Sequence, residues 1–183
     1  MKIKVTIDSN LINIRQKITS MNMLEQLHHD GKIEIVGSEK LFEEMRNSET
    51  AISKANKYRN ISEPFILGYS RLGKAYLSCD DKKLPSFTEI AHILFPNNIE
   101  LSENQSNDVM HLVAHSHSDS DYFITNNTKD FIHGKKTNQN RKENLQNLTR
   151  KKLEKISIKT LTPEEVIELY LKAKFQKQKI PKN

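Results

Sequence analysis

The sequence predicts an α/β protein of three layers, in which helices cover both faces of a mainly parallel central sheet. Short β-branched segments alternate with amphipathic helical segments along the 183 residues, and this alternation is typical of parallel sheets built from β–α units. The chain length also suits one domain of common size. We therefore expect a single domain over residues 1–175 and a basic tail over residues 176–183.

The first β–α unit is predicted within the first 31 residues. Residues 2–7 alternate polar and β-branched apolar side chains, which is a strand pattern that ends at Asp8. The expected apolar face consists of Ile3, Val5 and Ile7. Either Ser9 or Asn10 can then cap one helix that continues to a stop at Gly31.

A second unit follows, and the pattern weakens after it. Residues 33–36 predict a short strand, Ser38 can cap the next helix, and apolar residues from Leu41 onward predict that helix, which resumes from Ile52. Over residues 57–100 the periodicity is poor, and this segment is expected to be a helical insertion. Its two helical stretches are residues 65–77 and residues 87–95.

The last third of the chain returns to clear alternation. Residues 107–118 carry a helical apolar stripe, and residues 122–125 predict a short buried strand. Residues 155–161 predict the last strand. A strong helix start follows at Thr162, with Pro163 as the first helical residue and Glu165 completing a capping box.

The charge balance favours an anionic partner such as nucleic acid. Lys and Arg number 29 against 23 Asp and Glu, which gives a formal charge of +6. Residues 134–152 are rich in Lys and Arg and contain no aromatic residue, so they are expected on the surface as a loop or a solvated helix. The candidate contacts to a nucleic-acid backbone are Lys135, Lys136, Arg141, Lys142 and Arg150.

Several classes of protein are disfavoured by composition. One cysteine, Cys79, allows neither an internal disulfide nor a thiolate zinc site. No apolar run approaches the roughly 20 residues that span a bilayer, so no membrane contact and a cytoplasmic location are expected. The chain has neither a GxGxxG segment nor a Walker-type loop, so a phosphate group would have to be bound by a metal ion or by Arg and Lys.

Acidic residues lie where the predicted strands end or begin. Asp8 ends the first strand, Asp121 precedes the 122–125 strand, Asp130 follows it, and Asp108 lies in the first turn of the preceding helix. Mg²⁺ and Mn²⁺ prefer carboxylate oxygens, and two to four acids from different elements can hold such an ion. Each acid also has a plainer explanation, because Asp is common at helix caps and in surface turns.

Four blocks of the chain, in order, resemble the PIN-domain ribonucleases, the family that includes the VapC toxins. The strand with the first metal-binding Asp matches at Asp8, in VTIDSNLI. A helical Glu before an apolar residue matches at Glu44, rather than Glu43, in KLFEEM. The third acid matches at Asp108, in NDVMHLVAHSHSDSDYFITNN. The last strand and helix start match in ISIKTLTPEEVIELY.

The resemblance implies a PIN-like fold and a metal-dependent endoribonuclease that uses Mg²⁺ or Mn²⁺. Asp8, Glu44 and Asp108 would hold the ion, and Thr125 would orient the water or an acid. Many family members have Asp where this chain has Asn127, so the fourth metal contact is Asn127, Asp130 or Asp121. The resemblance further implies RNA as substrate, an antitoxin protein as a possible partner, and a possible homodimer.

Two alternatives remain open from the residues. A non-catalytic RNA-binding module with a degenerate PIN site would account for Asn127 and for the basic segment. His111 and His115 have the four-residue spacing of zinc ligands in HExxH enzymes, but no Glu follows His111. We expect these two histidines to pack or to form hydrogen bonds around the acidic pocket, and His117 to be exposed.

Overall fold

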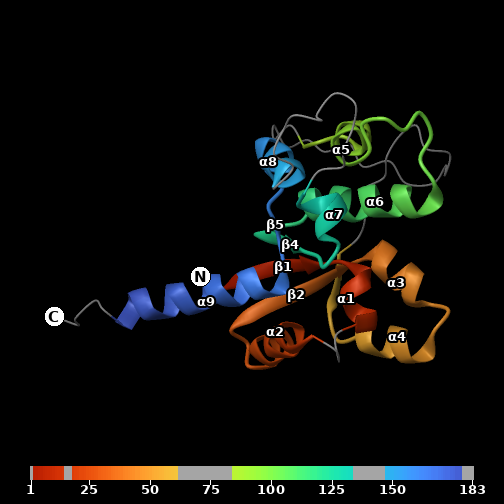
Figure 1. The fold of residues 1–183 in the computed structure, drawn as a ribbon. Coiled ribbons are helices and arrows are strands. Elements are labelled where there is room, and N and C mark those ends of the chain that lie inside the picture. The colour runs from red at the N-terminus through yellow and green to blue at the C-terminus, as the bar shows by residue number, and fades with distance from the viewer. Residues whose placement is uncertain (1, 15–17, 62–83, 134–146, 179–183) are drawn as a thin grey trace.

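A computed structural model of the chain describes residues 2–14, 18–61, 84–133 and 147–178. These residues contain a five-stranded sheet with the strand order β3-β2-β1-β4-β5, and every pair of neighbouring strands is parallel. Helices cover both faces, so the predicted three-layer α/β/α class is confirmed (Figure 1). The strands are β1 (Ile3–Ile7), β2 (Ile33–Ser38), β3 (Arg59–Ile61), β4 (Tyr122–Ile124) and β5 (Thr160–Leu161).

The described helices form two groups, one on each face of the sheet (Figure 1). Buried residues of the first group form one apolar cluster with β1 and β2, and those of the second form another with Phe123 of β4. The first group is α1 (Ser9–Ile14), α2 (Thr19–His29), α3 (Glu39–Met45), α4 (Glu49–Ala55) and α9 (Pro163–Gln178). The second group is α5 (Phe87–Leu94), α6 (Glu103–His117), α7 (Thr128–Phe131) and α8 (Leu148–Lys155).

Strand β1 is central, and its two faces differ in chemistry. Val5 and Ile7 belong to the apolar cluster of the first helix group, and Ile3 packs against it, as the alternation predicts. The opposite face carries Lys4, Thr6 and Asp8, which are all buried although they are polar or charged. A buried polar group is tolerated only when it has a partner, so the second helix group must supply partners along this face.

Helix α6 and the residues around it provide those partners. Lys4 forms an ion pair with Asp119, just after α6. Thr6 Oγ1 lies 3.0 Å from His115 Nδ1 in α6. Asp8, at the carboxyl end of the strand, accepts a hydrogen bond from Thr125. The polar face of β1 therefore fixes how α6 and the residues after β4 lie against the sheet.

The predicted single helix over residues 9–30 is wrong, because the structure has two helices there, α1 and α2. Ile18 has an extended backbone, with φ −116° and ψ 111°, and precedes α2. The interval of six between Ile12 and Ile18 matches neither the three- nor the four-residue spacing of one helical face. The predicted stop is confirmed, since α2 ends at His29 and Gly31 has a φ of +68°.

Other boundaries differ where polar residues end or begin an element. Helix α6 begins at Glu103, not at residue 107, because Ser102 and Gln105 form a capping box ahead of the apolar stripe. Asp108 therefore lies in the second turn of α6. The last strand is limited to Thr160–Leu161, and the final helix extends to Gln178, into the predicted tail of residues 176–183.

Three short elements were not expected at their positions. Strand β3 lies inside the segment of weak periodicity, α4 begins at Glu49 rather than near Ile52, and α7 follows β4 directly. The basic segment ends in α8, a helix that buries Thr149 and Leu153 and is therefore not solvated on all sides. Helix α5 confirms the helical prediction for residues 87–95, whereas residues 65–77 lie outside the described residues.

No helix among the described residues is both long and apolar enough to cross a bilayer.

Gly37 lets β2 and α3 approach closely. A Cβ built on Gly37 would lie 3.0 Å from Cε2 and 3.3 Å from Cζ of Phe42, in the first turns of α3. Contacts this short force the ring to move. Gly37 therefore lies at the close contact between the sheet and α3, the helix that also carries Glu44.

We expect Gly37→Ala to lower the free energy of unfolding by about 1 to 3 kcal/mol, because the added methyl group overpacks the Phe42 ring. Urea unfolding of the variant and the native chain measures the loss. In a Phe42→Leu background the same substitution should cost distinctly less. An equal cost in both backgrounds would contradict the steric explanation.

Candidate functional site

Asp8 lies at the position where open parallel sheets most often bind ligands. From β1 the chain adds β2 and β3 on one side, and β4 and β5 on the other. The strand order thus reverses between β1 and β4, and ligands bind at the carboxyl ends of the strands at such a switch point. Asp8 directly follows β1, and Thr125 directly follows β4.

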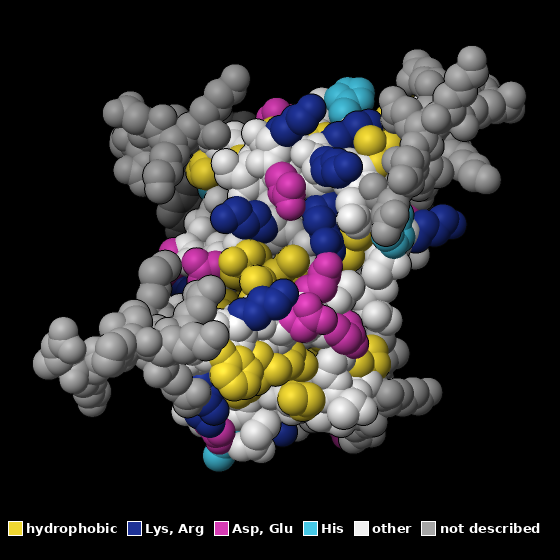
Figure 2. Space-filling view, turned by 60° about the vertical axis from the view of Figure 1, so that its left-hand side comes forward, with side chains coloured by type: hydrophobic (Ala, Val, Ile, Leu, Met, Phe, Trp, Pro, Cys, Tyr) yellow, Lys and Arg dark blue, Asp and Glu magenta, His cyan; other side chains and the backbone are white. Residues whose placement is uncertain are grey.

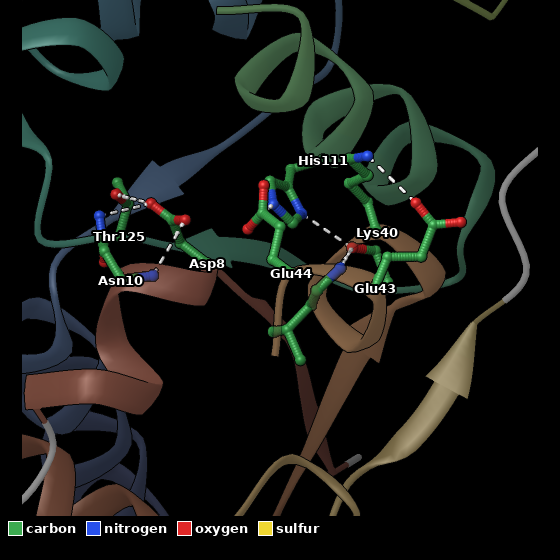
Figure 3. Close-up of polar contacts among 9 residues, drawn as sticks. Asp8, Asn10, Lys40, Glu43, Glu44, His111 and Thr125 are labelled. Atoms are coloured by element: carbon green, nitrogen blue, oxygen red, sulfur yellow. Dashed lines mark hydrogen bonds and ion pairs between the residues drawn. The ribbon is translucent and has the colours of Figure 1, made fainter. Parts of the chain in front are cut away.

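Hydrogen bonds from both sides of the switch point hold the Asp8 carboxylate. Thr125 Oγ1 donates to Asp8 Oδ2 at 2.6 Å, and Asn10 Nδ2 donates to the same oxygen at 2.8 Å (Figure 3). The carboxylate is only 3% exposed. The Oδ1 atom of Asn10 is buried and has no hydrogen-bond partner among the described residues. A buried acid beside an unpaired oxygen is an arrangement that a cation would stabilise.

Glu44 approaches Asp8 from α3, and its neighbour Glu43 does not. The Glu44 carboxyl group is turned toward Asp8 in Figure 3, with the His111 ring on its other side. His111 Nε2 lies 3.3 Å from Glu44 Oε2. Glu43 instead binds Lys40, with 3.1 Å between Oε2 and Nζ. Of the two acids, Glu44 is therefore the one that adds charge to the site.

Asp108 completes the acidic group from α6. Burial and the charge of Asp8 raise the pKa of the Asp108 carboxyl to about 7; Asp130 and Glu44 act in the same direction, whereas His111 opposes them. Like charges close together in a partly buried environment favour the protonated form of a carboxyl group. The site therefore concentrates more negative charge than its protein neighbours neutralise.

The other two acids respond differently to the same surroundings. Burial raises the pKa of Asp8, although His111 and the Thr125 hydrogen bond act against this rise. Burial also acts to raise the pKa of Glu44, but its hydrogen bond to His111 and the charge of that ring lower it below the ordinary value. Glu44 is thus stabilised as a carboxylate by a group within the protein.

Asn127 and Asp130 lie beside the switch point and bind each other. Asn127 caps α7, where its Oδ1 accepts from the Asp130 backbone N–H at 3.3 Å, and its Nδ2 donates to Asp130 Oδ2 at 3.0 Å. The Asn127 backbone N–H also donates to Thr125 Oγ1 at 2.9 Å. Asn127 therefore connects Asp130 to the residue that holds Asp8.

Asp121 lies at the opposite end of β4 and does not join this group. It precedes the strand, and its Oδ2 accepts from the backbone N–H of Lys4 at 2.8 Å. Because the strands are parallel, the amino end of β4 is remote from the carboxyl end of β1. Of the residues proposed for the fourth metal contact, Asn127 and Asp130 lie near the site and Asp121 does not.

His111 and His115 of α6 are buried and hydrogen-bonded, as predicted. His111 contacts Ser38 and Glu44, whereas the His115 ring contacts Thr6 and packs edge-on against Phe123. Burial lowers the pKa of His115 to about 4. His117 is exposed. The two buried rings have different partners, which does not favour the zinc alternative.

The donors near Asp8 suit a hard divalent cation. They are carboxylate and amide oxygens from β1, α1, α3, α6 and the β4–α7 turn, the ligand type that Mg²⁺ and Mn²⁺ prefer. In the part of the chain that the structure describes, no three His, Cys, Asp or Glu side chains already form a metal-binding group.

The basic residues proposed to bind nucleic acid are described only in part. Lys135, Lys136, Arg141 and Lys142 lie outside the described residues. The side chain of Arg150 is only 14% exposed, and it forms two hydrogen bonds with Glu165, of 2.8 and 2.6 Å. Basic side chains nevertheless gather on the face formed by α8 (Figure 2). The exposed lysines of α8 are Lys151, Lys152 and Lys155.

Sequence reasoning did not assign Asn10 and Ser38 to the site. Asn10 was expected as a helix cap, but its amide binds the Asp8 carboxylate. Ser38 was expected only as a cap for α3, and it also contacts His111. Their positions could have identified both residues from the sequence, because each lies at or just beyond the carboxyl end of a central parallel strand.

In comparisons with known proteins, no family model, no curated protein and no solved structure matches the chain. The function must therefore be derived from the chain's own residues.

We expect Asp108→Asn to stabilise the metal-free protein more at pH 8 than at pH 5. The folded protein raises the pKa of Asp108 from the ordinary value of 3.8 to about 7. Its ionisation therefore costs stability progressively as the pH rises from about 4 to about 7, and the full penalty is present above that range. We expect the free energy of unfolding to rise by about 1 to 3 kcal/mol at pH 8. One pKa unit corresponds to about 1.4 kcal/mol, and rearrangement of the neighbouring acids makes the gain smaller than the full shift would give.

Urea unfolding in EDTA at both pH values tests this expectation. Glu103→Gln is the matched control, because Glu103 is an exposed acid in the first turn of the same helix. A gain for Asp108→Asn that is the same at pH 5 and pH 8 would show that Asp108 is not under electrostatic strain.

Thr125→Val should lower the free energy of unfolding by about 1 to 3 kcal/mol. The substitution preserves shape but removes a hydroxyl that donates to the buried Asp8 carboxylate and accepts from the Asn127 backbone. Chemical denaturation measures the loss, and Thr50→Val, at an exposed position in α4, should change stability by less than about 0.5 kcal/mol. Equal effects of the two substitutions would exclude a special role for Thr125.

Proposed function

We propose that the protein is a PIN-type endoribonuclease that hydrolyses RNA phosphodiester bonds with Mg²⁺ or Mn²⁺. Asp8, Glu44 and Asp108 would hold the ion, with Asn127 or Asp130 as a further oxygen ligand. A bound divalent ion lowers the pKa of water and neutralises charge on a phosphoryl group. The enzyme would act in the cytoplasm.

The observation that carries this proposal is the accumulation of acids at the switch point. Asp8 is 3% exposed there, and its charge contributes to raising the pKa of Asp108 to about 7. Structural carboxylates are ordinarily paired with a cationic side chain, whereas Asp8 accepts hydrogen bonds from neutral groups of Thr125 and Asn10 and lies near two further acids. A site of this kind is suited to binding a cation and, through it, an anionic substrate.

Each residue around the proposed ion has a separate task. The hydrogen bonds from Thr125 and Asn10 orient the Asp8 carboxylate. Burial of that carboxylate excludes competing water and strengthens its electrostatic interactions. Asn127 holds Asp130 in place beside the site. A charge of +6 on the whole chain would draw a polyanion to the protein despite its acidic centre.

The choice of RNA and of a PIN-type enzyme also draws on the four matching sequence blocks. The resemblance to VapC toxins further implies that the proposed enzyme is the toxin of a toxin–antitoxin pair. An antitoxin peptide would silence such an enzyme by placing a basic side chain against Asp8, Glu44 and Asp108. A homodimer is likewise implied by the resemblance.

A second candidate is an RNA-binding module without catalysis. The exposed lysines of α8 favour this function, because several Lys or Arg residues that neutralise phosphates give salt-sensitive binding without a metal. Asn127, a neutral residue where many PIN enzymes have an acid, is consistent with a degenerate site. Retained RNA binding in EDTA with no cleavage in Mn²⁺ would select this candidate.

We expect a mixed RNA substrate to be cut in Mg²⁺ or Mn²⁺ and to stay intact in EDTA. Asp8→Asn, Glu44→Gln and Asp108→Asn should each lower the cleavage rate by at least about 100-fold, because each removes a charged ligand. Gel analysis of the RNA over time gives the rates.

Glu43→Gln is the matched control for Glu44→Gln. Glu43 is the adjacent acid in the same helix, and it binds Lys40 rather than the site. Its substitution should leave the rate within about threefold of the native value. Cleavage that survives Asp8→Asn and Asp108→Asn would contradict the proposal.

A further inference from the structure

His111 connects α6 to the acid supplied by α3, and its two ring nitrogens have different partners. Nε2 lies 3.3 Å from Glu44 Oε2, and Nδ1 lies 2.8 Å from Ser38 Oγ. The ring is 1% exposed, and Ser38 is fully buried. The contact with Ser38 is therefore shielded from water, where a hydrogen bond is electrostatically stronger than on the surface. The contact with Glu44 is partly buried, since that side chain is 23% exposed.

The donors and acceptors in this chain of contacts can be assigned from their chemistry. An ionised carboxylate only accepts, so Nε2–H of His111 donates to Glu44. The Ser38 hydroxyl can donate to Nδ1 when the ring is neutral and accept from it when the ring is charged, so this contact holds the ring in either state. The Ser38 oxygen accepts in turn from the Leu41 backbone N–H at 3.2 Å. The residue that caps α3 thus also holds the ring whose Nε2–H binds Glu44.

We propose that His111 is a positioning residue, which Ser38 orients so that its Nε2–H holds the Glu44 carboxylate toward Asp8. This inference rests on the proposed function, because it assigns to Glu44 the role of a metal ligand. Helix α3 has seven residues, and Glu44 is its penultimate residue. Glu44 also has a side-chain hydrogen bond with Ser9, so His111 provides a second contact that limits the rotamers of a Glu side chain at the end of a short helix.

The chain offers a matched pair of substitutions that separates this role from helix capping. Ser38 caps α3 and Ser48 caps α4, and each helix has seven residues. Each serine oxygen accepts from a backbone N–H three residues later, at 3.2 Å for Leu41 and 3.3 Å for Ala51. Ser38→Ala and Ser48→Ala therefore remove comparable caps, but only Ser38→Ala also removes a partner of His111.

The test is the dissociation constant for Mn²⁺, measured by titration calorimetry on the metal-free, full-length protein. His111→Ala should weaken Mn²⁺ binding about 10- to 100-fold, the usual effect of removing a group that orients a metal ligand. His111→Gln should stay within about threefold, since its amide can donate from nearly the same place as Nε2. Ser38→Ala should weaken binding by about 3- to 10-fold and Ser48→Ala should not. Ser38→Ala should also lose more stability in urea, because it removes a buried hydrogen bond to His111 in addition to the cap.

Glu44→Gln separates failure of this inference from failure of the proposed function. If Glu44→Gln binds Mn²⁺ as the native protein does, the metal site itself is wrong. If Glu44→Gln weakens binding but His111→Ala and Ser38→Ala do not, the site stands and the positioning role is overturned. Equal weakening by Ser38→Ala and Ser48→Ala would also overturn it, because the effect would then come from the lost caps. The serine pair decides the question even if His111→Ala does not fold.

Discussion

The polar face of β1 is the constraint on which the rest of the structure depends. A central strand of a parallel sheet is normally apolar on both faces, because helices cover both. Here Lys4, Thr6 and Asp8 occupy one face and are buried. Each requires a partner, and these come from α6, from the residues that follow it, and from the end of β4. The same requirement that orders this half of the fold also brings Asp8, Asp108 and His111 together.

The site is therefore a compromise between stability and chemistry. Apolar clusters on both faces of the sheet stabilise the fold. They extend close to the acids, because Leu11 and Leu112, which lie about one helical turn after Asp8 and Asp108 in the sequence, are fully buried members of these clusters. At the carboxyl edge, the protein gives up part of that stability by placing acids next to one another. Natural proteins depart from locally favourable choices mainly at functional positions. The departure at Asp8 and Asp108 is the physical reason to regard this edge as functional.

The sequence could predict those parts of the fold that depend on short-range pattern. The alternation around Val5 predicted β1, and the Thr162 capping box predicted the start of α9. The start of α6 was missed because its first turns contain almost no apolar residue, and only the Ser102 and Gln105 pair marks the boundary. Local periodicity also could not show that residues 9–30 form two helices.

The site was predictable to a similar degree and for related reasons. Asp8 and Thr125 could be placed at one edge, because parallel strands align their carboxyl ends. The contacts of His111 could not be foreseen, since Ser38 and Glu44 lie 73 and 67 positions away in the sequence. They depend on how α3 packs against α6, which no spacing within a single helix reveals. Asp121 and Asp130 both remained candidates from the sequence, although one precedes β4 and the other follows it. The parallel direction of β4 places only Asp130 at the edge that carries Asp8.

The hydrogen bond between Thr125 and Asp8 joins residues 117 positions apart, and this separation has a consequence for synthesis. During translation, β1, β2 and β3 emerge long before β4, and domains generally fold as units once their sequence is available. Contacts of such long range also form slowly, because they close a large loop. Until α6 and β4 have left the ribosome, β1 exposes Thr6 and Asp8 without their partners. The acidic centre therefore assembles only when most of the chain has been made, so a chain that ends before α6 would contain Asp8 and Glu44 without Asp108.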